Sequence, residues 1–187
     1  MTDEKKLLEA VRNNQRQALI DIYDTYQAQI YAYAYRTMLQ ADLAEECVAA
    51  TFHRLLEALQ KGKGPSTHLR AYLYRIAHNW MMDWYRHADK ELQQVDEQAD
   101  RWEDPEPSPV EIVSQRQLGD ELQAQLMQVT PDQREVLVLR FVEQYSLQET
   151  AMIVHKPLGA VKALQNRALT NLRKFYKQKD SEENERE

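Results

Sequence analysis

Cysteine and glycine are scarce in this sequence. Its 187 residues include a single cysteine, Cys47, and four glycines. One cysteine excludes a disulfide framework and a zinc site built on several thiolates within the chain, and no glycine-rich loop is present to hold a phosphate group. Cys47 falls on the apolar side of a predicted helix, where we expect it to be a small buried hydrophobic side chain.

The sequence also lacks a long apolar run. No stretch reaches the roughly 20 apolar residues that a membrane-spanning helix requires, and residues 1–6 are too charged to open a signal peptide. We therefore expect no direct membrane insertion, and a cytoplasmic protein.

The pattern of an enzyme is missing as well. The histidines show no metal-ligand spacing such as two on one helical turn, and there is no nucleophile elbow. Carboxylates are abundant, but they sit in helix caps and acidic segments, where paired acid–base chemistry is not expected. We predict no enzyme activity, no catalytic residue, no metal and no cofactor. The five histidines are His53, His68, His78, His87 and His155.

What the chain does contain favours an all-α fold. Long stretches of Ala, Leu, Gln, Glu, Lys and Arg are good helix formers. Residues 89–113 carry nine acidic side chains against two basic ones, and within them residues 96–109, with three alternating prolines, are expected to be extended and mobile. We predict two small helical domains joined by this acidic flexible linker, the second being a helix-turn-helix. For Trp102, within the linker, docking on a domain and contact with a partner both remain open.

Helical periodicity places four helices in the N-terminal domain. A short helix starts near Leu7, a longer one spans residues 18–37, and Asp42 with Glu45 three residues later is predicted to cap a third. After a basic loop at residues 61–65, a helix is expected from about residue 68 to residue 88.

The C-terminal part has the helix start and stop signals of a helix-turn-helix. Thr130 can cap a helix with Pro131 at its first position, and Ser146 with Glu149 predicts a capping box at the start of the next. Pro157 ends that helix. A last helix is expected from residue 158 or 159 to about residue 177.

The last helix carries the positive charge that a DNA-binding helix needs. Residues 159–179 contain six basic side chains and no acidic one. Lys162, Gln165, Asn166 and Arg173 fall mostly off the apolar stripe, and such side chains can bond base edges or neutralise phosphates. The alternative is a solvated basic surface helix.

Residues 69–86 form a second candidate surface. Arg70, Arg75 and Arg86, with three histidines (68, 78 and 87), are predicted to give this helix a basic exposed side interleaved with aromatic rings. Such a surface suits single-stranded nucleic acid, and Asn79 could read an unpaired base edge. Core aromatics beside a solvated basic face would produce the same pattern.

Taken together, these features resemble the bacterial sigma factors of the extracytoplasmic-function (ECF) group, in their two-domain type with regions 2 and 4. The resemblance covers most of the chain, from about residue 7 to residue 175. It rests on Ala44-Glu45-Glu46-Cys47-Val48-Ala49-Ala50-Thr51-Phe52, on Leu73-Tyr74-Arg75-Ile76-Ala77-His78-Asn79 followed by Asp83, and on Pro131-Asp132-Gln133-Arg134-Glu135-Val136-Leu137.

The resemblance implies a subunit that binds core RNA polymerase and promoter DNA. It implies region 2 at residues 1–90, a linker at 91–112 that threads the RNA channel, region 4 at 113–178 and a tail at 179–187. The implied contacts to the upstream (−35) element are Lys162, Gln165, Asn166, Arg167, Arg173 and Lys174. Those to the downstream (−10) element are Arg70, Tyr72, Arg75, His78, Asn79 and Arg86. Those to polymerase are Asp42, Glu45, Glu46, Thr51 and Phe52.

Several positions depart from the family's pattern. Ala49 and Ala50 replace a common Gln-Glu pair, which implies altered polymerase docking, and His155 replaces a turn glycine that often has positive φ. A helix-turn-helix regulator that does not engage polymerase is the alternative function. The resemblance also makes an anti-sigma factor a candidate partner.

Overall fold

The part of the chain that the structure describes consists of helices joined by short loops. The computed structural model describes residues 3–12, 16–95 and 124–184, and no strand occurs in these ranges. The all-α prediction is therefore confirmed. In chain order the elements are α1 (Asp3–Arg12), α2 (Arg16–Met38), α3 (Ala41–Gln60), α4 (Leu69–Val95), α6 (Pro131–Leu137), the π-helical turn η1 (Val138–Val142), α7 (Leu147–Ile153) and α8 (Leu158–Asn184).

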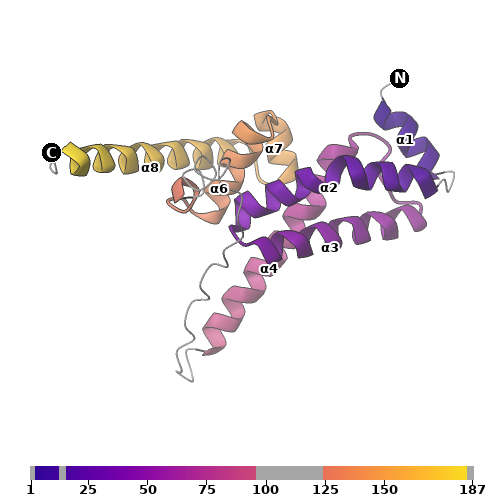
Figure 1. Cartoon of the computed structure of the whole chain (residues 1–187), viewed down its shortest axis with the longest axis horizontal. Helices are drawn as coiled ribbons and strands as arrows, with labels where there is room; N and C mark the ends of the chain where they lie inside the picture. Colours follow the sequence, from indigo (N-terminus) through magenta and orange to yellow (C-terminus); the bar gives the residue numbers. More distant parts are fainter. Residues whose placement is uncertain (1–2, 13–15, 96–123, 185–187) are drawn as a thin grey trace.

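Helices α1 to α4 form an N-terminal unit. α2 and α3 run antiparallel beside each other, α4 packs across both, and α1 contacts α2 (Figure 1). Ile22 and Ile30 of α2, Leu55 of α3 and Leu73 of α4 are all fully buried where these helices meet. Their spacing along each helix places them on one face, which is why three amphipathic helices close around a single core.

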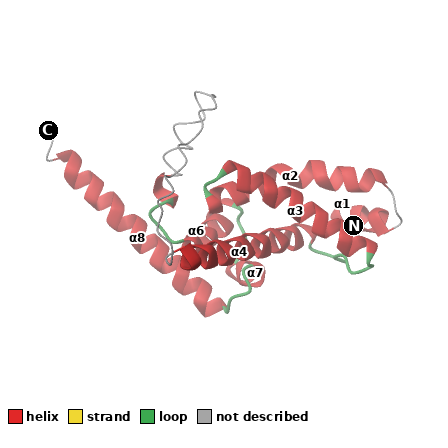
Figure 2. Ribbon diagram, turned by 90° about the horizontal axis from the view of Figure 1, so that it is seen from below, coloured by secondary structure: helices red, strands yellow, loops and turns green. Residues whose placement is uncertain are grey.

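Helices α6, α7 and α8, with η1, form a C-terminal unit. α8 packs against both α6 and α7, and Val161 and Ala168 on its apolar stripe are completely buried. Beyond this contact α8 projects away from the other helices, as Figure 2 shows from below. The predicted stripe on the last helix is confirmed, and the helix extends to Asn184, seven residues further than expected.

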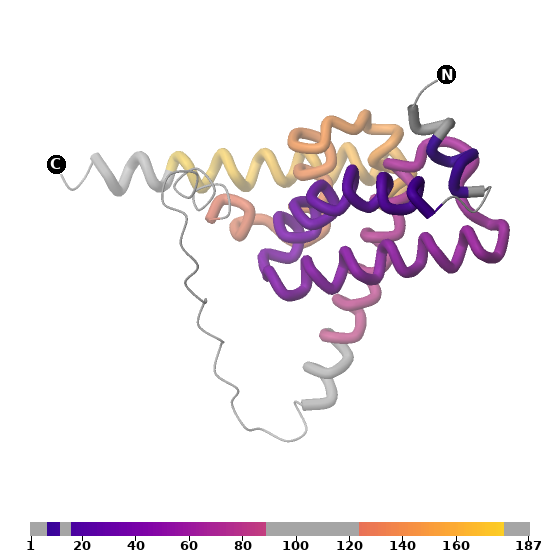
Figure 3. Tube along the Cα trace, turned by 45° about the vertical axis from the view of Figure 1, so that its right-hand side comes forward, coloured from indigo at the N-terminus to yellow at the C-terminus, as the bar shows by residue number. Residues whose placement is uncertain are grey.

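The two units pack against each other. α6 lies against α2, and α7 lies against α4 (Figure 3). Buried apolar side chains of α4, such as Tyr74 and Ala77, belong to the same cluster as Tyr145, Ile153 and Val154 of the C-terminal unit. The core of the N-terminal unit therefore continues into the C-terminal unit.

The helix boundaries correct two expectations. α3 begins at Ala41 with Gln40 at the N-cap position, so Asp42 lies inside the first turn and is not the cap. Its carboxylate there still has a favourable interaction with the helix dipole. α4 runs to Val95, so the first five residues of the predicted linker are helical. The rest of that linker, with Trp102, lies outside the described residues.

The predicted acidic tail is also partly helical. α8 includes residues 179–184 of the predicted tail, whereas residues 185–187 lie outside the described part of the chain.

Replacing Leu73 by alanine tests the core of the N-terminal unit. Leu73 is fully buried, and removing a buried leucine side chain costs about 2–5 kcal/mol because a cavity remains. We expect that loss in the free energy of unfolding measured with urea. Leu56→Ala on α3, where the side chain is 39% exposed, is the matched control and should cost about 0.5 kcal/mol or less. Similar losses in both variants would contradict this account of the core.

The burial of Cys47 predicts an unreactive thiol. Burial raises the pKa of Cys47 from 9.0 to about 12, so the side chain is a neutral thiol at pH 8, and the neutral form is not the nucleophile. We expect Ellman's reagent to leave the native protein unmodified at pH 8 and to modify one thiol per chain in urea. Fast modification of the folded protein would show that Cys47 is accessible.

Candidate nucleic-acid interface and docking surface

The helix-turn-helix is built around the predicted capping box at Ser146. Its Oγ accepts a hydrogen bond from the Glu149 backbone N at 3.2 Å, and its own backbone N donates to Glu149 Oε2 at 2.7 Å. These hydrogen bonds lower the pKa of Glu149. The capping box is confirmed, and it fixes where α7 begins.

The turn between α7 and α8 forms where the sequence predicts it. α7 ends at Ile153 and α8 begins at Leu158, after Pro157. His155 has a φ of 50°, in the left-handed region that favours glycine. The positive φ expected at this position is confirmed, with histidine in place of glycine. Thr130 is the N-cap of α6 with Pro131 next, although its side chain makes no capping hydrogen bond.

The exposed side of α8 carries most of the side chains predicted to contact the upstream element. Five of them are exposed: Lys162, Asn166, Arg167, Arg173 and Lys174. Gln165 differs, because it is half-buried and its Oε1 accepts a hydrogen bond from Arg140 Nε at 3.1 Å. Arg140 also donates to the Tyr145 carbonyl. Gln165 therefore joins α8 to the segment preceding α7.

The side chains of α4 that were predicted to contact the downstream element divide into two groups. Arg75, Asn79 and Arg86 are exposed, and Tyr72 is half-buried. The Arg75 guanidinium lies over the Tyr72 ring, 5.3 Å from its centroid, and Arg86 is paired with Asp83 one turn away. The four residues are spaced by three, four and seven positions, so they lie along one face of α4. This face presents an aromatic ring, an amide and two cations together.

His78 and Arg70 form the second group, and here the predicted exposed basic face needs correction. His78 is only 4% exposed, and its Nδ1 lies 2.7 Å from Glu135 Oε1 of α6. Arg70 is half-buried, and its Nη2 donates to Glu143 Oε2 at 2.9 Å. Helical periodicity could not reveal this, because both carboxylates belong to the other unit and lie at least 57 residues away.

The residues predicted to bind polymerase also divide. Asp42, Glu45 and Glu46 are exposed on α3, whereas Thr51 and Phe52 are buried at 0% and 8% exposure. Thr51 packs inside the N-terminal unit, whereas Phe52, although largely buried, lines an apolar pocket between α2 and α3.

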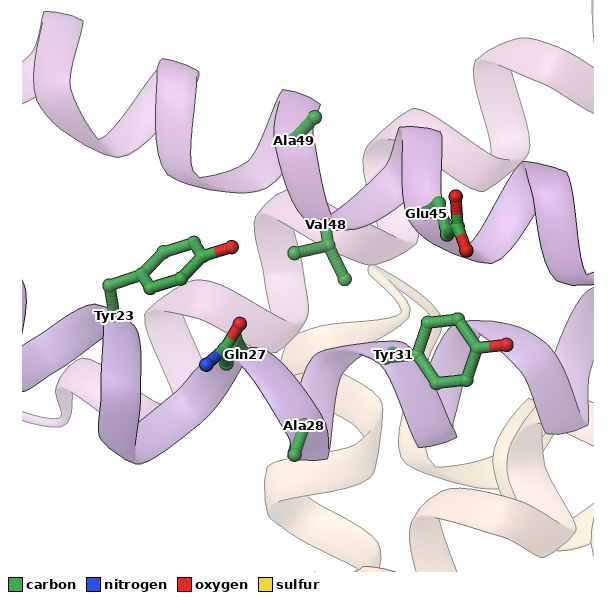
Figure 4. A pocket seen from close by; sticks show the side chains of 7 residues that line it. All are labelled: Tyr23, Gln27, Ala28, Tyr31, Glu45, Val48 and Ala49. Atoms are coloured by element: carbon green, nitrogen blue, oxygen red, sulfur yellow. The ribbon is translucent and has the colours of Figure 1, made fainter.

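A groove between α2 and α3 extends this acidic surface. It holds a pocket of about 380 Å³ in which side chains of the two helices face each other (Figure 4). An apolar pocket of about 270 Å³ follows it along the same helices and includes Ile20 and Leu56. The first pocket is lined by Tyr23, Gln27, Ala28, Tyr31, Glu45, Val48 and Ala49.

The α2 side of this groove was missed from the sequence. Ile20 and Tyr23 are 43% and 42% exposed, although both are large and apolar. Helical periodicity gave no signal for Tyr23, because it lies seven residues before Ile30 and so falls on the same face of α2. Only the packing of α3 shows that this part of the face borders a groove.

The described residues contain neither a metal-ligand cluster nor a candidate membrane span. No group of three or more His, Cys, Asp or Glu side chains in them could hold a metal ion. Within the same residues, no helix is long and apolar enough to cross a bilayer.

Family models match both units of the chain. The model described as Sigma-70 region 2 matches residues 22–91, and the model described as Sigma-70, region 4 matches residues 125–174. The first match covers most of α2, all of α3 and most of α4, with its basic side, and the second covers the helix-turn-helix.

Relatives extend the likeness over most of the chain. The ECF RNA polymerase sigma factor SigX of Bacillus subtilis is 31% identical over 157 residues, which are 82% of this chain and 80% of SigX. Two solved structures share the fold. The sigma factor RpoE of Bartonella quintana, in complex with the anti-sigma factor NepR, has a TM-score of 0.63 at 21% identity, covering 84% of this chain and 97% of RpoE.

CnrH, in complex with the cytosolic domain of CnrY, has a TM-score of 0.68 at 20% identity, covering 93% of this chain and 97% of CnrH. The two sigma regions and the SigX relationship point to one family. The chain therefore belongs to the ECF RNA polymerase sigma factors, and as a member of this family it directs transcription initiation at promoters.

Proposed function

We propose that residues 1–90 of this sigma factor dock on core RNA polymerase and bind the downstream promoter element, while residues 113–178 bind the upstream element. Residues 91–112 are proposed to connect these units, and residues 179–187 to form a C-terminal tail. The observation that carries this assignment is the match of both sigma regions, in order, to units with separate basic surfaces on α4 and α8.

The upstream element is proposed to bind α8 through the major groove. The recognition helix of a helix-turn-helix enters that groove with its N-terminal residues at the base edges. Lys162 and Asn166 lie in the first part of α8 and are exposed, so they are the proposed base contacts. Arg167, Arg173 and Lys174 are proposed to neutralise phosphates, which fix register without reading sequence. Gln165 is proposed to contact DNA once its hydrogen bond with Arg140 has been replaced by a hydrogen bond to DNA.

The downstream element is proposed to bind α4 as a melted strand. Tyr72 offers a ring for base stacking, Arg75 and Arg86 offer cations for the phosphates, and Asn79 offers an amide for a base edge. All four are accessible in this structure to some degree. Arg70 and His78 are proposed to join them only once Glu143 and Glu135 have moved away.

Polymerase is proposed to dock on the α2–α3 groove and the acidic residues beside it. Asp42, Glu45 and Glu46 supply charge, and the apolar pockets supply area that docking would bury. Thr51 is proposed to act by supporting α3 from inside, and Phe52 by lining the apolar pocket. Ala49 lines the groove, so docking there uses apolar contact where the family commonly has a polar side chain.

An anti-sigma factor is a further proposed partner. The similar sigma factor RpoE was solved in complex with the anti-sigma factor NepR, and CnrH in complex with the cytosolic domain of CnrY. The exposed apolar side chains along α2 and α3 would suit a helix of such a partner. We further propose that this sigma factor has no catalytic activity of its own, and that it acts in the cytoplasm, where bacterial promoter DNA and polymerase are found.

Run-off transcription tests the proposed function directly. Host core RNA polymerase is incubated with fragmented host DNA, with and without the protein. We expect discrete new start sites that share an upstream and a downstream element, because a sigma factor supplies both contacts. DNA binding without new start sites would instead favour a regulator that does not engage polymerase.

Lys162→Ala tests the upstream contact. On a duplex carrying the upstream element found by run-off transcription, we expect binding to weaken by about 1–3 kcal/mol, the cost of losing one base contact. Lys61→Ala is the control, because it removes one exposed cation at the end of α3, far from α8 in the sequence. Equal weakening by both variants would indicate a general charge effect without a specific contact.

Asn79→Ala tests the downstream contact. Asn79 is exposed on α4, so the variant should fold normally and should bind the upstream duplex like the unmodified protein. We expect fewer open complexes, measured by permanganate reactivity of unpaired thymines in complexes with polymerase. Normal promoter opening by this variant would remove Asn79 from the proposed contacts.

A further inference from the structure

The C-terminal unit places a buried glutamate against the N-terminal unit. Glu135 of α6 is 1% exposed. Its Oε1 accepts a hydrogen bond from Tyr33 Oη of α2 at 2.5 Å and lies 2.7 Å from His78 Nδ1 of α4. Burial and the nearby carboxylate raise the pKa of Tyr33, which keeps its phenol protonated as a donor. Both partners of this carboxylate therefore come from the other unit.

A second glutamate makes a similar contact eight residues further along the chain. Glu143 follows η1 and is 9% exposed. Its Oε2 accepts hydrogen bonds from Arg70 Nη2 at 2.9 Å and from the Tyr74 hydroxyl, and Arg36 Nη1 lies 3.9 Å from its Oε1. The Glu143 carbonyl also accepts from both terminal nitrogens of Arg70 at 3.2 Å. Here too, every side-chain partner belongs to the N-terminal unit.

Further contacts surround these carboxylates. The Tyr145 ring meets the Tyr74 ring edge-on at a centroid distance of 5.2 Å, and the Arg70 guanidinium lies 4.5 Å from the centroid of Tyr145. Arg134 Nη1 donates across the interface to the Thr37 carbonyl at 2.8 Å. The two units are therefore joined by complementary charges, hydrogen bonds and packed aromatic rings.

The groups that hold this interface include groups proposed to bind DNA. Arg70 and His78 are two of the six predicted contacts to the downstream element, and in this structure each faces a carboxylate. A carboxylate is the chemical equivalent of a phosphate oxygen for an arginine fork or an imidazole. By contrast, five of the six predicted upstream contacts on α8 are exposed.

We propose that Glu135 and Glu143 form an autoinhibitory contact in which the C-terminal unit occupies the downstream-element site of α4. The closed state binds upstream duplex DNA but not the melted downstream strand. This inference rests on the proposed role of α4, and it goes beyond that role by assigning a regulatory function to the packing of the units. Opening exposes Arg70 and His78 while both carboxylates return to water.

The chemistry of the contact suits a reversible device. Interfaces with many charged and polar groups can separate because water satisfies those groups once they are apart. If only a fraction of the molecules is open, the apparent affinity for the downstream strand falls by that fraction. A ligand that prefers the open state, such as polymerase, raises the open fraction in proportion to that preference.

Energy transfer between two labels measures the contact without any DNA. Labels are attached to His53→Cys on α3 and Thr170→Cys on α8 of the full-length protein, both exposed positions, while buried Cys47 stays unlabelled. We expect high transfer efficiency with the native interface and a clear decrease with Glu143→Ala. Glu57→Gln is the control, because that exposed carboxylate pairs only locally, with Lys61.

Tyr33→Phe provides a second, conservative opening variant. It removes only the hydroxyl that donates to Glu135 and keeps the volume of the ring in the core. It therefore replaces Glu143→Ala if circular dichroism shows that Glu143→Ala does not fold. We expect a smaller decrease in transfer efficiency than with Glu143→Ala. Low transfer in the unmodified protein, or equal transfer in Tyr33→Phe, Glu143→Ala and Glu57→Gln, would overturn the closed contact.

Binding of a labelled oligonucleotide tests the inhibition. The probe is the non-template strand of a downstream element identified by run-off transcription. We expect Glu143→Ala to bind it about tenfold more tightly, which corresponds to about one tenth of the unmodified protein being open. Binding of the upstream duplex should change less than about twofold.

The two measurements separate the two proposals. Unchanged strand affinity in a variant that has opened would overturn the inhibition. If no variant binds the strand at all, the proposed role of α4 fails as well, whereas unchanged energy transfer overturns the contact alone.

Discussion

Glu143 lies where the C-terminal unit meets α4, and its carboxylate is held by Arg70 and the Tyr74 hydroxyl. Glu135 makes the equivalent contact with Tyr33 and His78. A charged group that is buried in this way is tolerated only with partners, and removing one side of such a pair leaves an uncompensated charge. The relative placement of the two units depends on these contacts, because the position of α6 and α7 on α2 and α4 must satisfy both carboxylates at once.

The same contacts determine which functional surfaces are available. The cations of α8 from Lys162 to Lys177 are exposed, while Arg70 and His78 on α4 are engaged. The net charge of −6 for the whole chain therefore describes neither surface. Nine acidic side chains lie in residues 89–113 alone, and the local field near α8 is set by its own basic residues. A negatively charged sigma factor can thus present a positively charged surface on one helix.

Local chemistry explains why so much of the fold could be predicted. The capping box at Ser146, the break at Pro157 and the positive φ of His155 each depend on a few neighbouring residues. The error at Asp42 is also local, because a capping residue and a first-turn acid look alike in sequence. Both α4 and α8 end later than the sequence predicted. Apolar periodicity was the only indication of where each helix ends.

The sequence by itself determined the helices, the apolar faces that they bury, the helix-turn-helix and the family, because periodicity, caps and short motifs act over one or two helical turns. Only the tertiary structure decided that His78 is buried, that Arg70 is paired and that the α2 side chains beside α3 form a groove. These properties depend on Glu135, Glu143 and a second helix, all distant along the chain. Helical periodicity specifies which face a side chain occupies, whereas packing decides what lies against that face.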